Sequence, residues 1–330
     1  MERRTLLTGA AATAAAPALV KTHAQPGARD SAPVGQVAAL RLATTAFRRM
    51  EGVTPSRMLS DPVLAHLRLV QTLAGEMDDP DERARLAALG SEVASFAAWL
   101  AWDMADHGSA RTWYGTAVKA ARRSRNRLLV AYQLGSLAQM EAHMGNAQQG
   151  LSLIRAARSN LGEQPPAVAA GWLSATEAVA HAAGGDSQLA ADALTRAATA
   201  VERVGEQDAP PWPWVFIFDA ARVESFRVTC GALLGLPQWT AAAYRGARGV
   251  LTGEHDKQRA LLLLDFASGQ LAAGQLDGAF LLATRAVDIG LQRRSGRIID
   301  RARALRRAYT SPSPPKAIRD FDDRLHSAYI

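Results

Sequence analysis

The sequence predicts an all-α fold in which antiparallel helix pairs stack side by side into a superhelix. Three observations support this prediction. The hydrophobic content of 48% includes many alanines, while aromatic residues make up only 6%. Alanine has the highest helix propensity and lets neighbouring helices approach closely. Strand-like alternation is nearly absent, and one helical hairpin pattern recurs along most of the chain.

The recurring pattern is clearest from Ser91 to Asn126, where two helical stretches flank His107-Gly108-Ser109. A small residue marks the early part of the second helix in five such units, at Ala110, Gly150, Ala190, Thr240 and Ala279. The marker spacings are 40, 40, 50 and 39 residues. Because one helix pair cannot bury its apolar face alone, such a repeat predicts hairpins stacked on their neighbours.

Other positions keep the same register. Alanine stands seven positions after every marker, and a small or β-branched apolar residue stands twelve positions before it. Four positions after the markers come Tyr114, Ile154, Leu194, Tyr244 and Ala283. A turn glycine precedes each marker, at Gly108, Gly145, Gly185, Gly235 and Gly274. We therefore expect the same helix contacts and the same turn in every unit.

The chain divides into four predicted regions. Residues 1–33 form an alanine-rich leader or connector, residues 34–90 the leading helices, residues 91–310 about five hairpins, and residues 311–330 a C-terminal capping helix. The capping helix is expected because an array must cover its open end.

In the leading helices, Asp61-Pro62 predicts a helix start, with Asp as N-cap and Pro at the first helical position. We expect this helix to run from Pro62 to Met77. The acidic run at residues 78–82 stands at the next helix start, where carboxylates oppose the positive end of the helix dipole. Capping is therefore favoured over a metal cluster.

The first residues resemble a twin-arginine export signal of about residues 1–24. Arg3-Arg4 precede the apolar stretch Thr8–Val20, and small residues follow near Ala24. This stretch is too short and too rich in alanine for a stable membrane span.

Two local features interrupt the repeat. Residues 212–218 are β-prone by composition, but the prolines around them favour a turn that leads into a helix, and this insertion explains the 50-residue spacing. Cys230 is the single cysteine and lies in an apolar helical run, so we expect a buried small hydrophobe rather than a nucleophile.

The small–aromatic–small pattern resembles the tetratricopeptide repeat, which implies a right-handed superhelix. A second resemblance covers nearly the whole chain. The runs Phe96–Asp103, His107–Arg111, Pro211–Asp219 and Arg319–Leu325 look like the C-terminal sensor region of bacterial Xre-type helix-turn-helix transcriptional regulators. That family implies an N-terminal DNA-binding domain, but residues 1–90 contain no helix-turn-helix pattern. Direct DNA binding by this chain alone is therefore not expected.

The formal charge of +7 does not by itself indicate nucleic-acid binding. Only four of the 38 basic residues are lysines, so the other 34 are arginines, a bias that base composition alone can produce. The arginine clusters at residues 122–127 and 293–307 are interpreted as solvated helix ends rather than a phosphate-binding surface.

No catalytic or cofactor pattern is found. Phosphate-binding glycine loops, dinucleotide fingerprints, zinc-protease motifs and paired cysteines are all absent. The seven histidines are scattered, and helix-end or packing roles are favoured over a metal site for His143 and His181. We therefore expect no cofactor, no metal and no enzymatic activity, and an enzyme is the least favoured class.

Binding is the expected task, because the first helices of successive pairs line a concave groove. The repeat register places nine residues on or near this lining: Trp99, Trp102, Asp103, Tyr132, Gln139, His143, Trp172, Arg222 and Ser225. Arg222 and Gln139 suit a peptide backbone or carboxylate. Packing between repeats is the favoured role of Trp99 and Trp102.

The sequence thus predicts a non-enzymatic regulatory or signalling module that binds a peptide or protein partner and passes the change to a homodimer interface. The resemblance to regulators favours a cytoplasmic location. The alternative is a scaffold exported by the twin-arginine route that assembles protein partners outside the cytoplasm.

Overall fold

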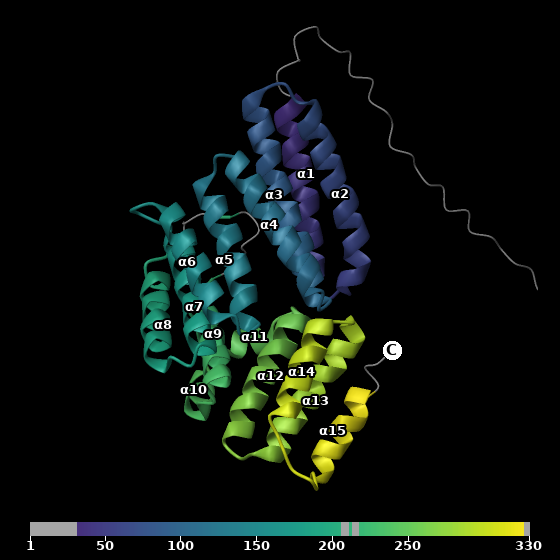
Figure 1. Ribbon diagram of the computed structural model, residues 1–330, viewed down its shortest axis with the longest axis vertical. Coiled ribbons are helices and arrows are strands. Elements are labelled where there is room, and N and C mark those ends of the chain that lie inside the picture. The colour runs from purple at the N-terminus through teal and green to yellow at the C-terminus, as the bar shows by residue number, and fades with distance from the viewer. Residues whose placement is uncertain (1–31, 206–210, 213–217, 327–330) are drawn as a thin grey trace, which may run out of the picture.

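The computed structural model describes residues 32–205, 211–212 and 218–326, and these contain fifteen helices and no strand (Figure 1). The helices are α1 Ala32–Glu51, α2 Ser56–Glu76, α3 Pro80–Asp103, α4 His107–Arg123, α5 Arg127–His143, α6 Ala147–Leu161, α7 Ala167–Ala183, α8 Ser187–Val201, α9 Ala220–Leu234, α10 Pro237–Ala243, α11 Arg248–Thr252, α12 Asp256–Ala272, α13 Leu276–Arg293, α14 Gly296–Arg307 and α15 Lys316–His326. The predicted all-helical fold is confirmed over this part of the chain. None of these helices is long and apolar enough to cross a membrane.

Consecutive helices pack as hairpins, and the hairpins pack on one another. The pairs that correspond to the five repeated hairpins are α3–α4, α5–α6, α7–α8, α9–α10 and α12–α13, and α2 also packs closely on α3. The first helices of successive hairpins also touch, from α3 through α5, α7 and α9 to α12. These first helices form the inner row, so their side chains reach the middle of the molecule.

The repeated alanines lie where helices meet. The residues twelve before and seven after each marker are all fully buried: Ala98, Ala138, Ala178, Val228 and Ala267, and Ala117, Ala157, Ala197, Ala247 and Ala286. The position four after the marker is buried in four units, but Tyr244 in the remaining unit is 52% exposed. The reason is that α10 ends at Ala243, so Tyr244 follows a short helix instead of lying inside a long one.

The turns confirm four of the five glycine predictions. Gly145, Gly185, Gly235 and Gly274 have φ between 64° and 82°, the left-handed region that glycine adopts without strain. The prediction for Gly108 was wrong. There α4 already begins at His107, capped by Asp106, and Ala105 has the left-handed conformation with φ of 62°.

The leading helices differ from the prediction at one helix start. α2 begins at Ser56, so Pro62 lies inside the helix and Asp61 is not its N-cap. The start is fixed by tertiary contacts, because the buried Ser56 hydroxyl bonds to Asp103. The capping prediction for the acidic run is confirmed, since Asp79 accepts a hydrogen bond from the backbone N–H of Asp81. The resulting helix α3 runs through residue 91 without a break.

Within the insertion, Trp212 is buried and its indole N–H donates to the carbonyl of Leu128 over 3.2 Å. The rest of the β-prone run, residues 213–217, lies outside the described residues. At the C-terminal end, α15 packs its buried Ile318 and Phe321 toward α13.

The two ends of the array meet, which the repeat pattern did not predict. In Figure 1 the purple and blue N-terminal helices stand directly above the green and yellow helices α12 and α14. The backbone N–H of Lys257 donates to the carbonyl of Gly52, and α14 contacts α3. A Cβ on Gly296 would lie 2.8 Å from the carbonyl oxygen of Met104, so glycine is required for this close approach. Side chains of the inner row of helices therefore converge on this junction.

Candidate functional site: a central cationic pocket

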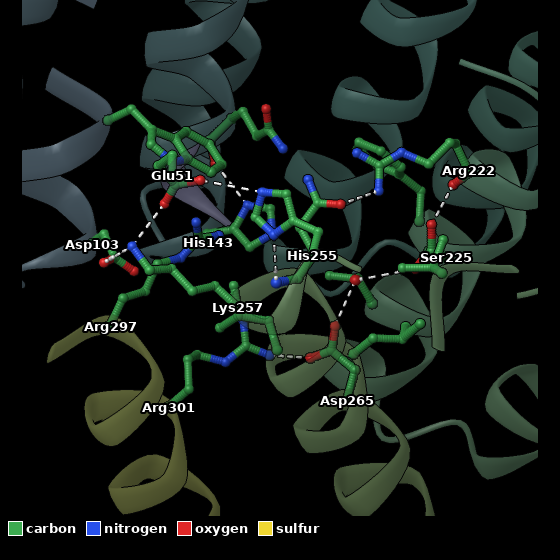
Figure 2. Close-up of a pocket in the computed structure, with 18 residues that line it drawn as sticks. Glu51, Asp103, His143, Arg222, Ser225, His255, Lys257, Asp265, Arg297 and Arg301 are labelled. Carbon is green, nitrogen blue, oxygen red and sulfur yellow. Dashed lines mark hydrogen bonds and ion pairs between the residues drawn. The ribbon is translucent and has the colours of Figure 1, made fainter. Parts of the chain in front are cut away.

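A cavity of about 110 Å³ lies where the inner helices converge on the junction between the two ends (Figure 2). Its walls come from the end of α1 and from α3, α5, α9, α11, α12 and α14. Among the ionisable lining side chains, four are cationic and three are acidic: Lys257, Arg222, Arg297 and Arg301, and Glu51, Asp103 and Asp265. The pocket is therefore lined by one more positive than negative charge, with both histidines counted as neutral.

A buried ion network closes one side of the pocket. The Lys257 ammonium lies 3.0 Å from Glu51 Oε1 and 2.9 Å from Asp103 Oδ2, and it donates to Ser56 Oγ over 2.8 Å. Asp103 also accepts from the hydroxyls of Ser56 and Ser295, each over 2.6 Å. We call these five residues the Lys257 clasp. Because every charge in it has a partner, the clasp joins α1, α2, α3, α12 and the start of α14 without leaving a buried charge unpaired.

His255 extends the network at the pocket edge. Its Nδ1 accepts from the backbone N–H of Gln258, and its Nε2 donates to Glu51 Oε2 over 3.2 Å. Burial alone would raise the pKa of Glu51, but the hydrogen bond from His255 and the charge of Lys257 outweigh it and lower the pKa to about 2. Glu51 is therefore ionised at neutral pH and belongs to the clasp rather than to a proton-transfer site.

Arg297 presents a charge that the chain itself does not neutralise by direct contact. Its guanidinium carbon stands 3.4 Å from the centre of the Trp102 ring, and the residue is 8% exposed. Burial and the neighbouring Arg301 lower the pKa of Arg297 to about 10, so it stays charged at neutral pH. Over the described residues its guanidinium has no carboxylate within ion-pairing distance and donates no hydrogen bond, whereas Arg301 pairs with Asp265.

Arg222 is a second cation of this kind. Its guanidinium donates to the side-chain carbonyl of Gln258 over 2.7 Å and forms no ion pair among the described residues. Burial lowers the pKa of Arg222. In Figure 2 it enters from the side of the pocket opposite Glu51 and Asp103.

His143 adds a neutral acceptor. Its Nδ1–H donates to the carbonyl of Gln139 over 2.8 Å, and its ring meets Trp102 edge to face. Burial and the charges of Arg297 and Arg301 lower the pKa of His143 to about 3. Because Nδ1 carries the proton, the lone pair of Nε2 can accept a hydrogen bond.

The structure brings together most of the predicted groove residues. Six of the nine line the cavity: Trp99, Asp103, Gln139, His143, Arg222 and Ser225. Trp102 is buried behind them and supports Arg297, which agrees with its expected packing role. Tyr132 and Trp172 lie apart from the cavity, stacked on each other against Trp212.

Six of the nine ionisable residues that line the cavity were not predicted from the sequence. These are Glu51, His255, Lys257, Asp265, Arg297 and Arg301. Lys257 carried the one usable signal, because it is one of only four lysines and lies in a helix rich in leucine. Glu51 reaches the cavity only because the two ends of the array meet, whereas Asp265 reaches it through the contact between α9 and α12. In the described part of the chain, no group of three histidine, cysteine or acidic side chains could hold a metal ion.

Comparisons with known proteins do not name a family. No family model matches the sequence, and no curated protein matches it. One similar solved structure is BtubC (BKLC) from P. vanneervenii. It shares 17% identity and covers 80% of this chain and 96% of its own, with a TM-score of 0.47.

Proposed function

We propose that this protein is a non-enzymatic binding module, a tetratricopeptide-like right-handed superhelix that takes an acidic group of a peptide or protein partner into its central pocket. The observation that supports this is the pair Arg222 and Arg297. Both are cations inside the pocket, and neither has an ion-pair partner among the described residues. An unpaired cation out of water is costly, so a ligand carboxylate placed between them relieves that cost.

The remaining pocket chemistry fits the same ligand. The acidic side chains are already engaged, Glu51 and Asp103 by Lys257 and Asp265 by Arg301, so they do not compete for the two arginines. Trp99 gives an apolar wall, and His143 Nε2 offers an acceptor to a ligand N–H. At about 110 Å³ the cavity takes one acidic side chain, and the rest of the partner stays outside.

The test compares two fluorescein-labelled pools of octapeptides that differ only in a central glutamate or glutamine. We expect the glutamate pool to bind more tightly in fluorescence polarisation. Arg222→Ala and Arg297→Met should each weaken that binding about tenfold or more, the value of a charge-assisted contact. Arg285→Ala is the matched control, since Arg285 is exposed on α13 away from the pocket. Equal binding of both pools, or unchanged binding by both pocket variants, contradicts the proposal.

By resemblance we place this module with signalling or transcriptional regulation in the cytoplasm. Export remains the second candidate, because Arg3-Arg4 precede an apolar stretch. The two are separated by the N-terminus of the protein isolated from cells. A mature chain that starts near Gln25 outside the cytoplasm supports the exported scaffold, whereas retention of residues 1–24 in the cytoplasm supports the regulator.

A further inference from the structure

Exposed large hydrophobic side chains are concentrated in the first two helices. Eight such side chains are exposed in the described part of the chain, and five of them belong to α1, α2 and the turn between them. These five are Leu42 at 71%, Met50 and Val53 at 42%, Met58 at 66% and Leu69 at 49%. A cluster of this kind on a folded protein marks an interaction surface, whereas single exposed residues do not.

The exposed residues follow helical spacing. On α1, Ala38, Leu42, Ala46 and Met50 recur every fourth residue and are all exposed. On α2, Met58, Pro62, Ala65 and Leu69 are likewise exposed at spacings of three or four. Such spacing places each set on one face of its helix. We call the two stripes together the N-terminal apolar face.

The two stripes lie at matching levels of one hairpin. The hydroxyl of Thr44 and Nε2 of His66 are 3.0 Å apart, which sets the middle of α1 beside the middle of α2. Because the two helices run antiparallel, Leu42 lies at about the level of Arg68 and Leu69, and Ala46 lies at about the level of Ala65, near the middle of the face.

The opposite end of the array has a different surface. The helix α15 buries Ile318 and Phe321 and exposes Lys316, Arg319, Asp320, Asp323 and Arg324. A charged outer face of this kind is what the last helix of a stacked array needs in water. The N-terminal end exposes charged residues as well, but between them run the apolar stripes of α1 and α2, which α15 does not have.

Charges on α2 indicate which neighbour fits. Asp61 and Arg68 are both exposed, and neither forms an ion pair or hydrogen bond with any described residue. They are seven residues apart, about 10.5 Å along the helix axis, which is too far for a pair within one chain. Two copies of α2 packed antiparallel about a twofold axis near Ala65 bring Asp61 of each copy beside Arg68 of the other.

We propose that the N-terminal apolar face is the interface of a homodimer of this protein. The contact is isologous, with α1 and α2 of one copy packed on α1 and α2 of the second and two symmetry-related Asp61–Arg68 pairs at its centre. This proposal does not depend on the ligand of the central pocket, because none of the residues of the N-terminal apolar face lines that pocket.

The first test measures the mass of the full chain by light scattering after size exclusion, from 1 to 100 µM. One chain has a mass of 35.2 kDa, and we expect the measured mass to be twice that value. Leu42→Glu and Leu69→Glu should each weaken the dimer about tenfold or more, because they bury an unpaired charge. Leu189→Glu and Leu281→Glu alter equally exposed leucines on α8 and α13 and should keep the dimer. Helical circular dichroism verifies that every variant is folded. A monomeric wild-type chain at 100 µM overturns the proposal.

The second test uses charge reversal, which separates this interface from any other dimer. Asp61→Arg or Arg68→Asp alone sets like charges together and should weaken the dimer about tenfold. The double variant Asp61→Arg/Arg68→Asp should restore the wild-type mass, because each new arginine again meets an aspartate of the second copy. If all three variants keep the dimer mass of the wild-type protein, the dimer forms through another surface.

Discussion

Ala105, in the turn between α3 and α4, occupies a backbone conformation that four equivalent turns assign to glycine. Its φ is 62°, beside 82° at both Gly145 and Gly185. An L-residue with a Cβ pays about 1–2 kcal/mol there. The same turn hydrogen bond is present in both kinds of unit, from Asp106 to Ala101 and from Asn146 to Glu141. The hydrogen bonds of the turn therefore determine its conformation, and glycine only lowers the free energy needed to adopt the left-handed backbone conformation.

Opposite substitutions in the two kinds of turn should change the stability of the protein in opposite directions. Ala105→Gly should stabilise the protein by about 0.5–1 kcal/mol, since relief of strain exceeds the added entropy of the unfolded chain. Gly145→Ala should destabilise it by about 1 kcal/mol. No heavy atom lies within 4 Å of a Cβ added at Gly145, so its effect reports the backbone alone. Urea unfolding followed by circular dichroism measures both, and shifts of the same sign would contradict the strain argument.

The environment of Arg297 could not be predicted from the sequence. The arginine cluster at residues 293–307 was expected to be solvated, yet Arg297 is buried against Trp102. Three other members pair with carboxylates on other helices: Arg293 with Asp256, Arg301 with Asp265 and Arg306 with Asp322. A run of arginines does not reveal its partners, because these partners come from other helices of the fold.

At the scale of helices, small residues decide how closely neighbours pack. A Cβ at Gly269 of α12 would lie 2.7 Å from the Cβ of Thr240, which is itself buried at the helix α10 contact. In contrast, a Cβ at Gly115 of α4 meets no heavy atom within 4 Å. Both glycines lie inside helices, so alanine improves the helix propensity at either position. Only at Gly269 does the added Cβ also collide with a neighbouring helix.

We therefore expect opposite effects from the same change. Gly269→Ala should destabilise the protein by about 1–3 kcal/mol, because the helices must move apart. Gly115→Ala should stabilise it by about 0.5–1 kcal/mol, because alanine is the better helix former. Thermal unfolding at neutral pH measures both variants. A stabilised Gly269→Ala protein would show that α10 and α12 are not held in close contact.

The local spacing of small and apolar residues was sufficient to predict most helices. The features that were not predicted depend on contacts between residues far apart in the sequence. The alanine register predicted buried positions in every unit because small residues at fixed spacing are what close helix packing requires. The start of α2 at Ser56 was not predictable, because it depends on Asp103 and Lys257, far away in the sequence. For the same reason the register found the pocket residues on α3, α5 and α9 but missed those on α12 and α14.

For the whole molecule, the decisive feature is the meeting of its two ends. Stacking of neighbours builds an array one contact at a time, and nothing in that rule brings the first helices to the last. The Lys257 clasp supplies this long-range contact, because Glu51 and Lys257 are 206 positions apart. It also forms one wall of the pocket, so a partner that binds there acts on the same junction.

The clasp predicts a defined response to acid. The pKa of Glu51 is lowered to about 2 by His255 and Lys257 in spite of burial, whereas in the unfolded chain it returns to about 4.5. A depressed folded-state pKa stabilises the fold at pH values above 4.5, and this contribution is lost as the pH falls toward 2. The shift corresponds to about 3 kcal/mol at neutral pH. Glu51→Gln should therefore lower the free energy of unfolding by an amount of this order at pH 7 and by less than half as much at pH 3.

Urea titrations of both proteins at the two pH values measure this difference, and other carboxylates cancel because both chains contain them. Glu163→Gln, a change at an exposed glutamate, should leave the midpoint unchanged at either pH. A gap between wild type and Glu51→Gln that is as large at pH 3 as at pH 7 would show that the carboxylate acts through packing alone. A gap that closes with acid ties the junction of the two ends to the charge of Glu51, because protonation removes only that charge and leaves the shape of the side chain in place.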